Sequence, residues 1–443
     1  MSQKKKKIGL VASTALVVGN MVGSGVFMLP AALAVYGDLS LWGWGLAAFG
    51  ALVLAFVFSA LGKHLSVGSG GPYRYTKSTL GEFAGFFVAW GYWISVWCTN
   101  AAIAIAFVGY LSVFLPELEA NRFFASCVGL SAIWFFTWIN SRGVKTTGAV
   151  QIVTVILKIF PLVLVAIGGL FFINVDYLFG AAIHSDGSSD IQMIIAAGTL
   201  VFFAFQGMES ATIPAEKTKK PKRNVPIATM VGILIAIVVY ISSYVSVAGV
   251  ISPEVLSKSS APFADAGAII YGDAARYWIA LGAIISTLGA LNGWILIQGE
   301  IPASIAGDNL FPKLFSKENK REVPIVGIAI SSVLASVLML MNYAQGLAET
   351  FKFIILLSTF SVLLPYLMAN VSLVWISIRL KLKWKWGFII LAIIGFLFSM
   401  LAIYGCGKEA FYYGILLLLA GFPIYIWMKR NKKGDNSKPN NST

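Results

Sequence analysis

The chain has 443 residues, of which 58% are hydrophobic and only 12% are charged, and its mean hydropathy is +0.82. Soluble domains carry about 25% charged residues, so this composition excludes an ordinary soluble protein and predicts one that crosses a membrane many times. The formal net charge of +14 would suit nucleic-acid binding. Its basic residues, however, gather between the apolar segments, which indicates membrane topology, and no nucleic-acid partner is expected.

Apolar runs long enough for about 20 residues per span predict about twelve membrane helices. In chain order, the expected spans are 8–36, 40–62, 83–114, 122–140, 148–173, 190–213, 225–250, 275–303, 323–343, 349–377, 386–405 and 410–428. The predicted fold class is therefore an all-α polytopic membrane protein. It has one membrane domain over residues 1–429, and the polar residues 430–443 are expected to form a disordered tail.

Two of these spans contain residues that interrupt a helix. In the first span, Asn20 is followed one turn later by Gly23-Ser24-Gly25, and the sixth span contains Gln206-Gly207. Backbone groups at membrane depth need partners, so a break is tolerated only where it faces protein or a water-filled cavity. Paired interruptions in two halves of a chain indicate the binding site of a transporter.

The positions of the breaks divide the chain into two repeats of five spans. The repeats are expected at about 8–173 and 190–377 with inverted topology, and two further helices follow at about 386–428. Half-helix N-terminal ends attract an anionic group, and exposed carbonyls at C-terminal ends suit a cation. A zwitterionic amino acid presents both groups and is the natural ligand.

The distribution of the 33 Lys and Arg residues predicts the orientation. Most of them fall in alternate loops and both terminal segments, which places both termini in the cytoplasm by the positive-inside rule. No eukaryotic targeting signal is visible, so the expected location is the inner (plasma) membrane of a bacterium.

Other classes of protein find little support in the residues. Cys98, Cys127 and Cys406 lie in apolar segments at no metal-ligand spacing, so neither a disulfide, a metal site nor a cofactor is expected. A membrane enzyme would need a cluster of catalytic side chains near one face, and with two histidines and no Gly-x-Ser-x-Gly elbow an enzyme is not expected. A channel remains an alternative, because broken helices also build selectivity filters.

Several motifs, taken in order, resemble those of the amino acid–polyamine–organocation superfamily. They are Gly19 to Phe27, Gly70-Gly71-Pro72-Tyr73-Arg74-Tyr75, Gly207-Met208-Glu209-Ser210, Lys222 to Pro226, Ala261-Pro262-Phe263 and Asp308 to Pro312. The resemblance covers nearly the whole chain and is closest to basic amino acid/polyamine antiporters of the arginine/agmatine and putrescine/ornithine type. Those exchangers also suggest a homodimer.

The resemblance implies a site at the two breaks. Its expected substrate-binding residues are Asn20, Ser24, Gly25, Tyr92, Ser95, Val96, Asn100, Phe203, Ala204, Gln206, Trp294 and Ser358. The expected coupling and gating residues are Lys158, Glu209, Tyr73 and Tyr366. Phe203 stands where arginine/agmatine exchangers have a tryptophan that stacks on the guanidinium, and Gln206 replaces an apolar residue. Because a cation stacks less strongly on phenylalanine, strict arginine/agmatine selectivity is not expected.

Lys158 lies about ten residues inside the fifth span, where a lysine is costly and usually functional. In proton-coupled members of the superfamily, a lysine amine takes the place of a cation site at the fifth helix. The hypothesis is that Lys158 gains and loses a proton during transport and that its amine bridges the first and fifth helices in one state. The alternative is a structural lysine that snorkels or pairs permanently with backbone carbonyls.

The sequence thus predicts a secondary active transporter that moves amino acids across the plasma membrane by alternating access, coupled to protons. Its partners are a small amino acid or amine, protons and membrane lipid. The runner-up is an arginine/agmatine-type or polyamine/cationic amino acid antiporter. In that case decarboxylated amines would compete for the site, and Lys158→Ala would spare exchange.

Overall fold

The computed structural model describes residues 8–65, 71–143, 148–183, 187–212, 218–341 and 346–436, without the side chains of Ser24, 148–154 and 431–436. The uninterrupted long helices are α3 (Leu39–His64), α5 (Glu82–Leu111), α7 (Arg122–Ser141), α8 (Gly148–Gly169), α11 (Pro221–Val250), α14 (Asp273–Gly307), α15 (Ile325–Met341), α16 (Leu347–Arg379) and α17 (Lys385–Gly405). Two interrupted spans consist of α1 (Leu10–Met21), α2 (Ser24–Leu33) and η1 (Ala34–Tyr36), and of α10 (Asp190–Phe202), η2 (Phe203–Phe205) and η3 (Met208–Thr212). Short helices connect them, and a last pair closes the chain: α4 (Gly71–Leu80), α6 (Glu117–Ala120), α9 (Val175–Leu178), α12 (Pro253–Leu256), α13 (Pro262–Tyr271), η5 (Lys313–Ser316), α18 (Gly407–Leu419) and α19 (Gly421–Asn436).

The all-α polytopic fold is confirmed. Within the described ranges, 10 helical segments are long and apolar enough to cross a membrane, and two shorter apolar helices, Val155–Gly169 and Ile325–Met341, occupy the fifth and ninth expected spans. The tail differs from expectation, because α19 continues as a helix to Asn436. Residues 437–443 of the expected disordered tail lie outside the described part of the chain.

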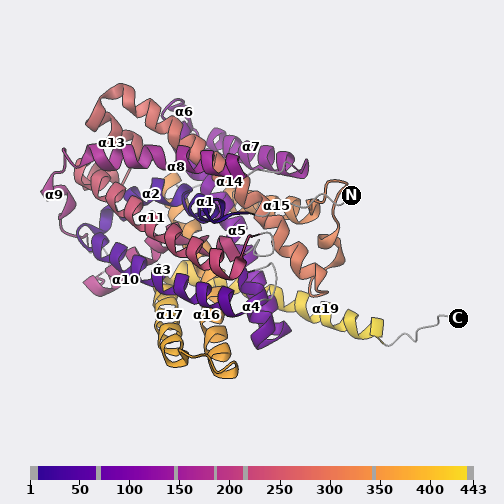
Figure 1. Cartoon of the computed structure of the whole chain (residues 1–443). Coiled ribbons are helices and arrows are strands. Elements are labelled where there is room, and N and C mark those ends of the chain that lie inside the picture. The colour runs from indigo at the N-terminus through magenta and orange to yellow at the C-terminus, as the bar shows by residue number, and fades with distance from the viewer. Residues whose placement is uncertain are drawn as a thin grey trace.

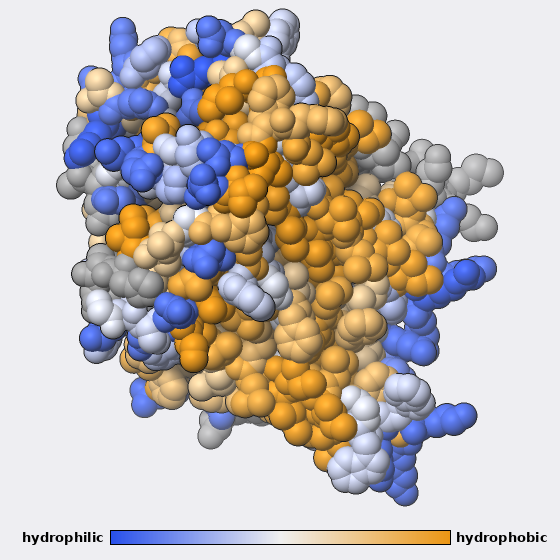
Figure 2. All heavy atoms as spheres, turned by 90° about the vertical axis from the view of Figure 1, so that its left-hand side faces the viewer, coloured by the Kyte–Doolittle hydropathy of each residue, from blue (hydrophilic) through white to orange (hydrophobic). Residues whose placement is uncertain are grey.

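The outer surface of the bundle is itself apolar. Figure 2 shows a broad band of hydrophobic residues across one face, with hydrophilic residues gathered along its two margins. Large exposed side chains such as Phe160, Val238, Leu397 and Leu416 come from four different helices. A water-soluble monomer rarely exposes so large an apolar patch, so this band is the surface that contacts lipid.

The interrupted helix α1 lies in the middle of the bundle, whereas α7, α9, α17 and α19 lie toward its periphery (Figure 1). The central α5 packs mainly against α14 and α16 and is almost entirely buried. Small residues permit this close approach: a Cβ on Gly91 would lie 2.8 Å from the carbonyl oxygen of Ser361. Close helix contact through small residues is how membrane helices associate, since lipid provides no hydrophobic drive between them.

Both predicted breaks are confirmed. The first helix ends at Met21, and Val22 and Gly23 leave the helical conformation before α2 begins. In the second break, the extended Gln206 is followed by Gly207 with φ +96°. A Cβ at position 207 would lie 3.2 Å from the Trp294 ring and 3.3 Å from Asn20, so only glycine fits this turn without strain. The inverted relation of the two repeats stays a prediction.

We predict that Gly207→Ala lowers the melting temperature of the purified protein and slows transport. An L-residue at positive φ costs about 1–2 kcal/mol, and the added methyl group presses on Trp294 and Asn20. Thermal unfolding in detergent measures the change. The matched control is Gly45→Ala on α3, where an added Cβ meets no atom within 4 Å. This control keeps or raises stability, because alanine is the better helix former. An unaffected Gly207→Ala protein would contradict the prediction.

Candidate functional site

The two breaks lie against each other. A Cβ on Gly25 would come within 3.1 Å of Ala204, so α2 and η2 meet backbone to backbone at this point. The side-chain amide of Asn20 donates a hydrogen bond of 2.9 Å to the Ser210 hydroxyl, and Ser210 in turn donates to the carbonyl of Gly207. Asn20 therefore connects the end of the first half-helix to the turn in the second.

Buried side chains from two other helices satisfy the open end of α1. The last four carbonyls of a helix have no partner within it, and that end carries a partial negative charge. The Lys158 ammonium on α8 donates to the Gly19 carbonyl at 2.8 Å, and the Trp294 indole on α14 donates to the Asn20 carbonyl at 3.2 Å. Lys158 is only 4% exposed, so its charge is held inside the protein. The break is thus a polar node that joins α1, α8 and α14.

The other helix ends at the breaks offer complementary backbone groups. α2 begins after Gly23, and the first N–H groups of a helix have no intrahelical acceptor, which makes this end attractive to an anion. α10 and η2 end at Phe205. The carbonyls at this C-terminal end carry a partial negative charge, which suits a cation. The breaks therefore present helix ends of opposite partial charge.

A small cavity lies between the breaks. It is lined by Asn20, Met21, Gly23, Gly25, Thr99, Ile103, Phe203, Ala204, Gln206 and Trp294. Its volume is about 10 Å³, enough for roughly one water molecule. An amino acid is several times larger, so binding one requires the lining helices to move apart.

A hydrogen-bonded frame fixes one wall of this cavity. The Gln206 amide donates to the Thr359 hydroxyl at 2.9 Å, and its carbonyl accepts from the Ser358 hydroxyl at 3.1 Å. The hydroxyls of Ser358 and Thr99 lie 2.9 Å apart, which links α16 to α5. Gln206 is therefore held in one orientation by both ends of its side chain.

Glu209 has two tyrosine partners. The Tyr92 hydroxyl donates to one carboxylate oxygen at 2.6 Å and the Tyr366 hydroxyl to the other at 2.8 Å. Glu209 is fully buried, and a buried carboxylate is tolerated only when it is hydrogen-bonded. This triad ties η3 to α5 and α16 just beyond the second break.

A charged clamp closes one end of the bundle, which we call the basic end because Arg74, Lys77, Arg142 and Arg321 lie there. Asp308, at the end of α14, forms ion pairs of 3.0 Å with Arg74 and 2.9 Å with Lys77, and accepts a hydrogen bond of 2.5 Å from the Tyr73 hydroxyl.

The clamp changes the pKa values of its members. Burial raises the pKa of the Asp308 carboxyl, but the hydrogen bonds from Lys77 and Tyr73 and the two positive charges outweigh burial and leave the pKa below its usual value of 3.8. Burial and the hydrogen bond to Asp308 raise the pKa of Tyr73, which therefore stays protonated.

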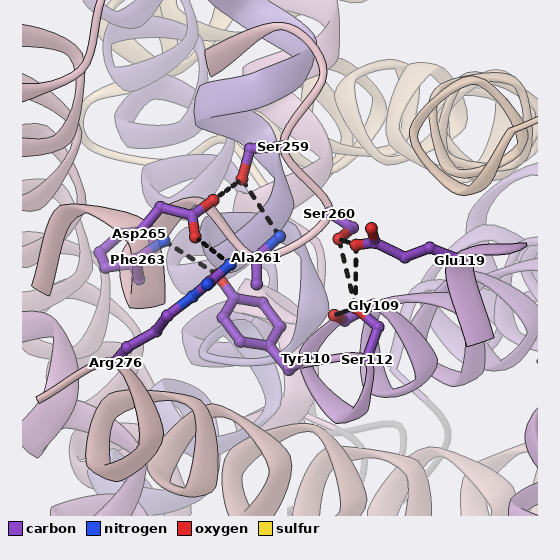
Figure 3. Close-up of polar contacts among 10 residues, drawn as sticks. All are labelled: Gly109, Tyr110, Ser112, Glu119, Ser259, Ser260, Ala261, Phe263, Asp265 and Arg276. Carbon is purple, nitrogen blue, oxygen red and sulfur yellow. Dashed lines mark hydrogen bonds and ion pairs between the residues drawn. The ribbon is translucent and has the colours of Figure 1, made fainter. Parts of the chain in front are cut away.

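The polar contacts at the opposite end include an ion pair of 2.9 Å between Arg276 and Asp265 (Figure 3). The Tyr110 hydroxyl donates to the Phe27 carbonyl at 2.8 Å and accepts from the Phe263 N–H at 3.3 Å, so α5 connects α2 to α13. Nearby, Ser260 donates to Glu119 on α6. Polar contacts thus join neighbouring helices at both ends of the bundle.

The structure brings half of the predicted binding set to the cavity wall: Asn20, Gly25, Phe203, Ala204, Gln206 and Trp294. The Ser358 hydroxyl donates a hydrogen bond to the side-chain carbonyl of Gln206, and the Tyr92 hydroxyl donates one to Glu209. On α5, Ser95 donates to the carbonyl of Tyr92 in its own helix, and Asn100 donates to Gln298 of α14 at 2.7 Å. Neither Ser95, Val96 nor Asn100 lines the cavity, and the side chain of Ser24 lies outside the described part of the chain.

The predicted binding set lacks four lining residues: Met21 and Gly23, which adjoin predicted residues at the first break, and Thr99 and Ile103 on α5. Thr99 and Ile103 share a helix face with Ser95 at intervals of four residues, and this spacing is the signal that would have identified them. Among the described residues, no group of three or more His, Cys, Asp or Glu side chains gathers to hold a metal ion.

A bundle of membrane helices with two facing breaks around a central cavity is the architecture of a secondary transporter. The comparison with known proteins agrees. The family model for amino acid permeases matches residues 8–412, and the chain belongs to that family.

The relatives that resemble this chain are also transporters. It is 33% identical over 374 residues to the cadaverine/lysine antiporter of Escherichia coli (strain K12), which covers 83% of each chain. It is 31% identical over 435 residues to the putrescine transporter PotE of Haemophilus influenzae, covering 96% of this chain and 98% of that one. Together with the family match, these relatives confirm the resemblance found in the motifs and give the channel alternative no support.

We predict that Asp308→Asn destabilises the protein at neutral pH and that the difference from wild type disappears in acid. A carboxyl whose pKa is lowered by folding contributes stability above its unfolded pKa, and this contribution is lost as the pH falls through the folded value. Melting temperatures in detergent between pH 7 and about pH 3 test this. The control is Asp176→Asn on the exposed α9, which leaves the curve unchanged. Equal stability of Asp308→Asn and wild type at pH 7 would contradict the prediction.

Proposed function

We propose that this protein moves amino acids across the membrane by alternating access and that Lys158 couples transport to protons. The observation that carries the proposal is the hydrogen bond of 2.8 Å from the buried Lys158 ammonium to the Gly19 carbonyl. It joins α8 to the open end of the first broken helix, at the margin of the cavity.

Protonation of Lys158 would change the energy of this contact. A charged donor makes a hydrogen bond roughly twice as strong as a neutral one, and here the acceptor lies at the negative end of a helix. A buried ammonium is costly without such partners. With the proton bound, Lys158 holds α1 against α8; after the proton leaves, α1 is freer to move. The proton thus biases the position of the half-helix that borders the substrate.

Transport would require the cavity walls to separate toward one surface at a time. The spans that contain α1–α2, α3, α10–η3 and α11 rock against the remaining helices. The aromatic side chains of Phe203 and Trp294 cover the substrate. Glu209 with Tyr92 and Tyr366, and Tyr73 with Asp308, hold the two halves together on the basic side of the cavity.

The substrate would bind between the breaks. Its carboxylate takes the N–H groups at Ser24 and Gly25, and its ammonium takes the carbonyls near Phe205. The remaining predicted contacts on α5 and α16, Ser95, Val96, Asn100 and Ser358, would approach the substrate when the helices rearrange.

Orientation follows from charge. The basic end faces the cytoplasm by the positive-inside rule, so both termini are cytoplasmic, and the membrane is the inner membrane of a bacterium. A homodimer remains a prediction from the resemblance. We expect transport without catalysis, because the site presents gates and backbone ligands for a substrate that leaves unchanged.

Exchange of two substrates is the second candidate, and the names of the relatives favour it, since one is a cadaverine/lysine antiporter. In an obligate exchanger the carrier returns only after a second substrate binds it on the opposite side of the membrane. Lys158 would then be a permanent partner of Gly19 with no role in coupling.

Uptake into proteoliposomes separates these candidates. Radiolabelled amino acids are offered with and without an inward-directed proton gradient to wild type, Lys158→Ala and the control Lys352→Ala. Lys352 also lies in a membrane helix, but its ammonium rests 5.7 Å above the Tyr36 ring. We expect the gradient to drive accumulation of the labelled amino acid in wild type and Lys352→Ala. Under the same gradient, Lys158→Ala should accumulate at least about tenfold less.

A counterflow assay shows whether loss of gradient-driven uptake in Lys158→Ala reflects lost coupling or a misfolded protein. Lys158→Ala should still exchange internal for external substrate, because the cavity residues are intact. Uptake that requires an internal amino compound, ignores the gradient and survives Lys158→Ala would refute proton coupling and establish exchange.

A further inference from the structure

We infer that the turn between α16 and α17 binds the headgroup of an anionic phospholipid. This α16–α17 turn comprises residues 378–387 and carries three lysines two residues apart, Lys381, Lys383 and Lys385. The site lies on the outside of the bundle and is separate from the central cavity and from the substrate proposed for it.

An open hollow of about 590 Å³ lies at the α16–α17 turn. Sites for small molecules typically measure roughly 300–1,000 Å³, so the hollow is large enough for a phosphate-bearing headgroup. Its wall contains all three lysines together with Trp384 and Trp386, and no Asp or Glu is among the described residues that line it. A phosphate in the hollow would meet positive charge from several sides.

Backbone hydrogen bonds fix the shape of the α16–α17 turn. Lys381 has φ +48°, and the Leu382 N–H donates to the Ser377 carbonyl at 3.2 Å, which ends α16 in a Schellman motif. The Lys385 ammonium lies 5.3 Å from the centre of the Trp386 ring, an attractive contact that orients this charge. The hollow is therefore formed before any ligand binds.

The charges of the three lysines have no acidic partner in the protein. Lys77 of the clamp pairs with Asp308, whereas none of the three lysines forms an ion pair within the described ranges. The sequence contains no Asp or Glu between Glu349 and Glu409. The positive-inside rule accounts for lysines at this end of the bundle, but it does not require them to surround one hollow. Like charges around a hollow without a counter-charge attract an anion.

The α16–α17 turn lies at the basic end of the bundle. The Thr79 hydroxyl on α4 donates to the Ser372 hydroxyl near the end of α16 at 2.8 Å. The His64 ring at the end of α3 lies 5.6 Å from the Phe388 ring at the start of α17. Because α4 also carries residues of the Asp308 clamp, the turn and the clamp share one end of the bundle, where helices leave the membrane.

An exposed apolar stripe leads from the hollow along α17. Trp386, Ile390, Ile393 and Leu397 follow one another at intervals of four, three and four residues, so they share one helix face, and each is at least 50% exposed. Tryptophan favours the level of the lipid headgroups, and the aliphatic side chains suit the acyl chains beyond it. A phospholipid can therefore place its phosphate among the lysines and its chains along the stripe, whereas a free phosphate would use the lysines alone.

Lipid titration of the purified full-length protein in detergent tests the site. Phosphatidylglycerol, phosphatidylcholine with the same acyl chains, and soluble glycerol phosphate are added separately, and native mass spectrometry measures the affinity of the tightest-bound molecule. We expect phosphatidylglycerol to bind at least about tenfold more tightly than either of the others. Phosphatidylcholine has no net negative charge, and glycerol phosphate has no acyl chains.

Replacing the three lysines of the turn with glutamine tests the cause. Each lysine near an anionic headgroup contributes about fivefold in affinity, so the triple variant should bind phosphatidylglycerol at least about tenfold more weakly. Its binding of phosphatidylcholine should not change. The matched control replaces three exposed lysines elsewhere, Lys222, Lys317 and Lys320, with glutamine and should bind phosphatidylglycerol as wild type does.

Three results would each overturn the inference. They are equal phosphatidylglycerol binding by wild type and the triple variant, equal affinities of wild type for the two lipids, and equal binding of glycerol phosphate and phosphatidylglycerol. The last result would assign the hollow to a soluble phosphate. Because the replaced side chains are exposed, the variants should have the melting temperature of wild type before lipid is added. Should the triple variant not fold, Lys383→Gln alone decides, with an expected loss of about fivefold.

Discussion

The structure depends on one constraint: backbone groups at membrane depth must find partners inside the protein. The break after Met21 leaves the last carbonyls of α1 without helical partners, and the fold answers with Lys158 and Trp294 from two different helices. Because these partners come from separate elements, the open helix end is also a joint between them. The need to satisfy the backbone at membrane depth therefore brings side chains of α8 and α14 to the first break.

The two deeply buried charges have complementary positions around this joint. Lys158 binds the end of the first half-helix, and Glu209 binds two tyrosines beyond the second break. Each charge is paired within its own neighbourhood rather than with the other, so either contact can be remade without leaving the other charge alone. At the two ends of the bundle, the Asp308 clamp and the Tyr110 contacts join neighbouring helices.

Family membership and specificity have different physical origins in this protein. Membership rests on the breaks, the small residues that let helices meet, and the order of the spans, which together determine a transporter. The proposed substrate site is instead a small cavity lined by a few side chains, among them Gln206 and Phe203.

The sequence by itself determined the spans, because hydrocarbon demands long apolar segments, and it located both breaks, because Gly23 and Gly207 stand where a helix must open. It also identified Lys158 as exceptional, since a lysine so deep in an apolar run is costly. Only the tertiary structure decided which face of α5 meets the cavity, placing Thr99 there and turning Asn100 toward Gln298. Partners such as Tyr366 for Glu209 and Asp308 for Tyr73 lie more than 150 residues apart, and packing rather than local pattern selects contacts at that separation.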